Sequence, residues 1–138
     1  KALERHFSAR NGLESLLDRL DKKGIKTAVF SDYGCMERKM MALGIDCSRF
    51  SLIADSPSFG GFKPSATSFR KLASALGLEP SEILMVGDRT DTDGDGAKAC
   101  GMQFIHLFKN DKVAARFRRH PVEDGVEHLK WEEFCDKF

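Results

Sequence analysis

The sequence predicts an α/β fold, in which a mostly parallel sheet is flanked by helices. Short apolar runs rich in β-branched residues alternate with amphipathic segments along the chain, as expected for strands joined by helical crossovers. Glycines typical of helix C-termini separate each helical segment from the next strand, at Gly24, Gly44, Gly77 and Gly101. The length of 138 residues and the hydrophobic fraction of 41% fit one globular domain over residues 1–138.

The first half of the chain contains two helix-strand pairs. Leucines in residues 13–23 recur at i, i+3, i+4 and i+7, which predicts a helix, with Asn11 as a candidate N-cap. Residues 25–30 and 50–54 are short apolar runs that predict strands. Residues 36–43 predict the helix between them.

The second half continues the alternation. Residues 65–76 carry an apolar face and predict a helix, with Pro64 suited to its first turn. The continuous apolar run 83–86 is typical of a buried strand. A helix, a strand and a terminal helix are expected at residues 96–100, 104–108 and 131–138. The chain also begins, at Lys1, inside what looks like a helix.

Composition excludes several functional classes. Lys and Arg number 22 and Asp and Glu 21, so the net charge of +1 predicts no general attraction to nucleic acid or anionic membranes. No apolar run approaches the ~20 residues of a membrane span. No two cysteines are close enough for a CxxC pair, which favours reduced thiols in a cytoplasmic protein. The cysteines are Cys35, Cys47, Cys100 and Cys135.

Residues that follow the predicted strands are the candidates for function, because ligands bind beyond the carboxyl ends of parallel strands. Ser31 and Asp32 follow the first strand, where a hydroxyl and backbone N–H groups can form an anion site or an ordinary turn. Lys63, after a Gly-rich loop, is either a phosphate or carboxylate clamp or a surface lysine at a helix start.

An acidic segment follows the third predicted strand. Residues 87–96 contain one Arg and four Asp, namely Asp88, Asp91, Asp93 and Asp95. Convergent carboxylates need protons or a cation, and oxygen ligands favour Mg²⁺ or Ca²⁺ over Zn²⁺; otherwise this is a solvated loop with capping residues. The start of an EF-hand pattern at Asp91 is misleading, because Met102 occupies the position that needs a bidentate Glu.

The histidines are scattered along the sequence. His106 falls within a predicted strand, and none of the four has a sequence neighbour that suggests a triad or a metal site. We therefore interpret all of them as structural or surface residues. They are His6, His106, His120 and His128.

The order and spacing of these signals over residues 12–107 resemble the haloacid dehalogenase (HAD) superfamily. Residues 25–31, ending at Ser31, look like its second motif, and Lys63 followed by proline looks like its third. Gly87-Asp88 with Asp93 looks like its fourth motif, GDxxxxD. A receiver-like signalling domain, also α/β, places its acids in a different order.

The resemblance implies a three-layer, Rossmann-like core and Mg²⁺-dependent hydrolysis of a small phosphomonoester through an aspartyl-phosphate. It makes Ser31, Lys63 and Asp88 the catalytic residues, and Ser31, Asp32 and Lys63 the phosphate-binding ones. Asp88 and Asp93 would bind Mg²⁺. Dehalogenase chemistry, which needs no Mg²⁺, fits the paired acids less well. Substrate identity is not implied, since a cap domain normally selects it.

One departure from the family is serious. Its first motif, a strand ending in DxDx[TV], has no counterpart in the chain. That strand would lie between those ending at Ser31 and Asp88, so we expect residues 1–138 to be the C-terminal part of a core whose nucleophile strand and cap lie upstream of Lys1. The chain alone would then be inactive. Its partner would be a complementing N-terminal segment or a second copy; the alternative is a non-catalytic binding or regulatory module.

Overall fold

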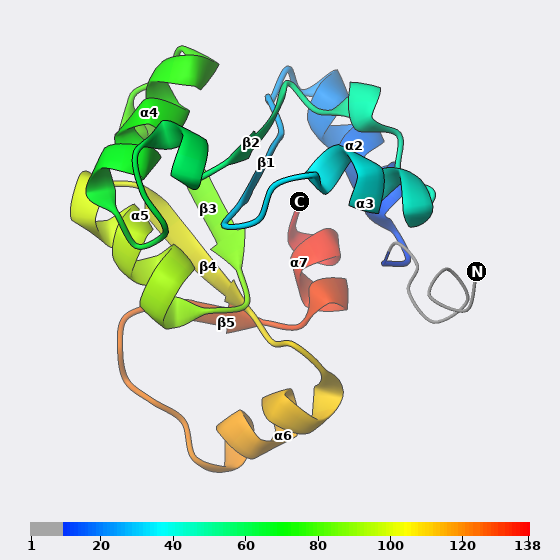
Figure 1. Ribbon diagram of the computed structural model, residues 1–138. Helices are drawn as coiled ribbons and strands as arrows, with labels where there is room; N and C mark the ends of the chain where they lie inside the picture. Colours follow the sequence, from blue (N-terminus) through cyan, green and yellow to red (C-terminus); the bar gives the residue numbers. More distant parts are fainter. Residues whose placement is uncertain (1–9) are drawn as a thin grey trace.

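The computed structural model describes residues 10–138, in which helices and strands alternate (Figure 1). The start of the chain, where a helix is expected, lies outside the described residues. The strands are β1 (Ala28–Ser31), β2 (Leu52–Asp55), β3 (Leu84–Gly87), β4 (Gln103–Leu107) and β5 (Glu127–Leu129). The α-helices are α2 (Leu13–Lys22), α3 (Met36–Ala42), α4 (Ala66–Leu76), α5 (Asp95–Cys100), α6 (Asp111–Arg119) and α7 (Trp131–Lys137).

Every strand pairing is parallel, which confirms the predicted α/β class. β1 pairs with β2, with Ser31 opposite Asp55. β4 lies between β3 and β5, with His106 opposite both Gly87 and His128. Ser31 is the last residue of β1 and Asp88 directly follows β3, so both lie at the carboxyl ends of their strands.

The strands form two separate sheets. The order is β1-β2 in one sheet and β3-β4-β5 in the other. Within residues 10–138, no strand pairs with the second side of β1 or of β3. Each therefore keeps one edge of backbone N–H and C=O groups without a strand partner among these residues.

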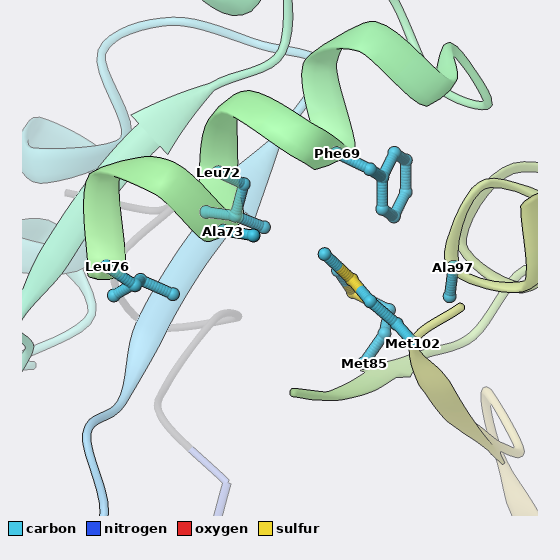
Figure 2. Close-up of a cluster of buried hydrophobic side chains, with 7 residues drawn as sticks. All are labelled: Phe69, Leu72, Ala73, Leu76, Met85, Ala97 and Met102. Carbon is cyan, nitrogen blue, oxygen red and sulfur yellow. The ribbon is translucent and has the colours of Figure 1, made fainter. Parts of the chain in front are cut away.

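A shared core holds the two sheets in one layer. Buried side chains of α4 point toward Met85 of β3 and Met102, with Ala97 of α5 at the edge of the cluster (Figure 2). Phe30 of β1 and Leu52 of β2 pack against the same cluster. The other side of β3 and β4 faces a second cluster, formed with α2 and α7 by Leu16, Ile105, Leu107 and Phe134. The result is three layers, helix-sheet-helix.

Three parts of the chain differ from the sequence prediction. Helix α6 and strand β5 lie between residues 108 and 131, for which no element was expected. β5 is only three residues long, and Val113 and Phe117 are the only large apolar residues of the strongly basic α6, so neither element stands out as an apolar segment in the sequence. Residues Thr90–Gly94 form a π-helical turn, η4, just before α5.

The starts of α2 and α4 also differ from the sequence prediction. The N-cap of α2 is Gly12, with φ of 87°, and no side chain caps the helix. Asn11 instead accepts a hydrogen bond at its backbone carbonyl from the Trp131 indole, 2.7 Å away. α4 begins at Ala66, after N-cap Ser65, so Pro64 precedes the helix and does not occupy its first turn; the Lys63-Pro64 peptide is cis.

The four cysteines all lie among the described residues. All four cysteines are free thiols. Among the described residues, no helix is both long and apolar enough to cross a bilayer.

Candidate active site

The site lies where β1 and β3 end. Ser31 is the last residue of β1, Asp88 directly follows β3, and Asp93 lies in η4. Lys63 comes from the loop before α4 and reaches the Phe30 carbonyl of β1 and the Asp93 carboxylate of η4. Segments far apart in the sequence therefore converge at the sheet edge where the sequence predicts ligand binding.

An ion pair between Lys63 and Asp93 is the centre of this site. The Lys63 ammonium lies 2.7 Å from Asp93 Oδ1 and donates to the backbone carbonyl of Phe30 over 2.8 Å. It also lies 5.1 Å from the centre of the Phe30 ring. The Lys63 and Asp93 side chains are only 10% and 11% exposed, so this pair is held in a poorly solvated position. It joins the end of β1 to η4 although their sheets are not hydrogen-bonded.

Gly87 makes room for this ion pair. A Cβ atom at position 87 would lie 2.6 Å from Asp93 Cγ, well inside van der Waals contact. Any larger residue would push the Asp93 carboxylate away from Lys63. This close approach is the physical reason for glycine before Asp88, a signal that is visible in the sequence as Gly-Asp.

Asp32 fixes the position of the loop that carries Lys63. Its carboxylate accepts a hydrogen bond from the buried Ser56 hydroxyl and a second, over 2.9 Å, from the backbone N–H of Lys63. These contacts tie the ends of β1 and β2 to the lysine loop. They account for the position of Lys63, whereas direct phosphate binding by Asp32 stays a prediction, and a carboxylate there would repel the anion.

Ser31 is half-buried at the mouth of the site. Its hydroxyl oxygen accepts a hydrogen bond from the Tyr33 backbone N–H, 3.0 Å away. Within residues 10–138, the Ser31 hydroxyl donates no hydrogen bond. The group is therefore available to donate to an anion.

The acidic segment divides into three roles. Asp93 is buried against Lys63, and the Asp88 side chain is exposed at the site. Asp91 points to Arg89, 2.7 Å away, on the surface. The hydrogen bond from that guanidinium holds the pKa of Asp91 below its ordinary value. Asp91 therefore belongs to a surface ion pair and not to the site.

The donor chemistry suits a hard cation, but the described residues do not complete a metal centre. Asp88 and Asp93 offer carboxylate oxygens, which fit Mg²⁺ in kind. Among residues 10–138, no cluster of three or more His, Cys, Asp or Glu side chains converges as a metal site. A cation at Asp88 and Asp93 would need its remaining oxygen ligands from water, substrate or another segment.

Sequence reasoning missed a histidine pair beside the site. His106 Nδ1 and His128 Nδ1 are 2.8 Å apart, and His106 Nε2 lies 3.2 Å from the backbone carbonyl of Asp88. His128 Nε2 is 3.0 Å from Asp124 Oδ1. The pairing arises from the register of β4 and β5, and β5 carries too little sequence pattern to be identified.

The family model for haloacid dehalogenase-like hydrolases matches residues 1–101 of this sequence. The chain therefore belongs to that hydrolase family. The part of the core from α2 to α5 contains the five residues that the family resemblance singles out, namely Ser31, Asp32, Lys63, Asp88 and Asp93.

Relatives of known activity are phosphatases. The chain is 34% identical over 105 residues to a glyceraldehyde 3-phosphate phosphatase of Pyrococcus furiosus, covering 75% of this chain and 43% of that protein. It is 37% identical over 86 residues to a phosphoglycolate phosphatase of Aquifex aeolicus, covering 62% of this chain and 40% of that protein. The chain thus spans about two-fifths of the length of these relatives.

Solved structures confirm the fold. An HAD phosphatase from Thermococcus onnurineus superimposes with a TM-score of 0.74 at 24% identity, over 94% of this chain and 57% of that one. A β-phosphoglucomutase from Clostridium difficile gives a TM-score of 0.70 at 20% identity, over 99% of this chain and 60% of that one.

Proposed function

We propose that this chain supplies the phosphate-binding and metal-binding half of a Mg²⁺-dependent phosphatase that hydrolyses small phosphomonoesters in the cytoplasm. The observation that carries the proposal is the buried Lys63–Asp93 pair at 2.7 Å, held beside Ser31 and Asp88. Phosphatase relatives support the reaction class. The four free thiols are consistent with a reducing compartment.

Each residue has a chemical role in this proposal. The Lys63 ammonium and the Ser31 hydroxyl hold oxygens of the phosphoryl group and stabilise the charge that spreads over them during transfer. Asp88 and Asp93 would hold Mg²⁺, which neutralises charge between an acidic nucleophile and the phosphate. Asp32 keeps Lys63 in place by accepting a hydrogen bond from its backbone N–H.

The nucleophile belongs to a separate strand in this proposal. Two features support a parallel strand with an acidic end between β1 and β3. Both strands have an unpaired side within the described residues, although they share one core. No apolar strand of the sequence ends in DxD. The same segment, or a further domain next to it, would carry the cap that selects the substrate.

Phosphate release tests the proposal. The protein as its gene encodes it, and residues 1–138 alone, are assayed with Mg²⁺ on phosphoglycolate, glyceraldehyde 3-phosphate and other small phosphomonoesters. We expect release by the gene product only, lowered about 10²–10³-fold by Lys63→Met. The exposed pair offers a control, Arg89→Met, which leaves release unchanged.

Two other results would change the conclusion. Rapid release by residues 1–138 alone would contradict the proposal of a separate nucleophile strand. No release by either protein, with Mg²⁺ and phosphate still bound in a calorimetric titration, would favour the alternative of a non-catalytic binding module.

A further inference from the structure

A chain of hydrogen bonds runs across the ends of β3, β4 and β5 and stops at the Asp88 backbone. In order, it consists of Asp124, His128, His106 and the Asp88 carbonyl, with distances of 3.0, 2.8 and 3.2 Å. Asp124 is held in turn by the backbone N–H of Val126, 3.0 Å from Oδ1. The three linked side chains come from two strands and a loop outside the phosphate site.

Both ends of this chain accept hydrogen bonds. A carbonyl cannot donate, so His106 must carry a proton on Nε2 to bond Asp88. The Asp124 carboxylate likewise accepts a hydrogen bond from His128 Nε2, so an acceptor lies at each end of the series.

His128 links the two ends of this series of hydrogen bonds. Its ring lies beside the Asp124 carboxylate, and this hydrogen bond holds the pKa of Asp124 below its ordinary value. His106 faces His128 through Nδ1 and donates to the Asp88 carbonyl from Nε2. The arrangement fixes one tautomer of His106.

Asp88 needs such support because little else holds it. It follows Gly87, the residue type with the greatest backbone freedom. The Asp88 side chain is exposed and makes no hydrogen bond to any residue in 10–138. The carbonyl bonded to His106 is therefore the tie that orients this peptide and, through it, the carboxylate.

We propose that His106 is a positioning residue for Asp88, held in its donating tautomer by His128 and Asp124. The inference rests on the proposed function for its consequence, which is a correctly aimed Asp88 carboxylate at the Mg²⁺ site. Phe117, 4.4 Å from the His128 ring, and Phe108, 5.3 Å from the His106 ring, pack around the pair and restrict its motion. Metal-binding groups are commonly oriented by such indirect contacts.

The first measurement is independent of activity. Long-range ¹H–¹⁵N NMR spectra of the imidazoles are expected to show His106 protonated at Nε2 only. Backbone ¹⁵N relaxation is expected to show a rigid Asp88 amide in the unchanged protein and faster local motion in His106→Leu. His106→Gln, whose amide can donate to the same carbonyl, is expected to restore the order.

Calorimetric Mg²⁺ binding is the second measurement. We expect the dissociation constant to rise about tenfold in His106→Leu, and most of that loss to be recovered in His106→Gln. Asp124→Asn changes the far, partly exposed end of the chain and is expected to act in the same direction by a smaller factor. His120→Leu is the matched control, because His120 is exposed and takes no part in this series of hydrogen bonds. It is expected to leave the Mg²⁺ affinity unchanged.

The outcomes separate this inference from the proposed function. Equal order at Asp88 in His106→Leu and the unchanged protein, or Nδ1 protonation of His106, would overturn the positioning role. A protein that binds no Mg²⁺ but loses order at Asp88 in His106→Leu would retain the positioning role and overturn the metal site. Loss of stability in His106→Leu with no rescue by Gln would reduce His106 to a packing residue.

Discussion

Replacement of Lys63 by methionine should strongly destabilise the protein. The change keeps the length of the side chain but removes the ammonium, which leaves the Asp93 carboxylate at 11% exposure without its partner 2.7 Å away. Removal of one member of a buried ion pair costs about 3–5 kcal/mol, because the other charge stays desolvated. Domains of this size unfold with about 5–15 kcal/mol, so roughly a third of the stability is at stake.

Urea unfolding followed by circular dichroism measures this cost. With a urea dependence near ~2 kcal/mol per molar, the midpoint of Lys63→Met should fall by about 1.5–2.5 M. Adding Asp93→Asn to that variant removes the stranded charge and should recover part of the loss, so the two changes are non-additive. Additive effects, or a Lys63→Met midpoint no lower than that of the exposed-pair control Arg89→Met, would refute the reasoning.

Three further predictions follow from burial. Gly87→Ala, whose Cβ would lie 2.6 Å from Asp93 Cγ, should break the Lys63 pair and abolish Mg²⁺ and phosphate binding in calorimetry, whereas unchanged binding would contradict the close approach. Phe69→Ala, at a side chain with 0% exposure, should cost about 3–5 kcal/mol in urea unfolding, and a loss below about 1 kcal/mol would mean that the core collapses into the space. Burial raises the pKa of Cys135, so its thiolate fraction at pH 8 is smaller and iodoacetamide should label it more slowly than the exposed Cys35; peptide mass mapping checks the order, and equal rates would contradict it.

Most of the fold could be predicted because short stretches of sequence determine its helices and strands. Helices α2, α3, α4, α5 and α7 lie within one or two residues of the predicted segments, since apolar spacing and terminal glycines mark them. The strands shift slightly further, to Ala28–Ser31 for the first, because an apolar run shows burial and not hydrogen bonding. β5 was missed because its three residues form a strand only through pairing with β4.

Part of the site could also be predicted from the sequence. Ser31, Lys63, Asp88 and Asp93 follow predicted strands, and parallel topology gathers such positions at one edge. The sequence did not predict which side chain each of these groups contacts. The structure shows that Asp32 contacts Ser56 and Lys63, because the ends of β1 and β2 lie side by side in the folded chain; its predicted binding of phosphate stays a prediction.

The sequence by itself determined the α/β alternation, the family and the residue types available for phosphate and metal binding, because local patterns and motif spacing carry that information. Tertiary structure alone decided which of them meet. It paired Lys63 with Asp93 in a poorly solvated position, left one side of β1 and of β3 unpaired within residues 10–138, and linked Asp88 to His106. These contacts depend on strand register and close packing between distant segments, which no local pattern encodes.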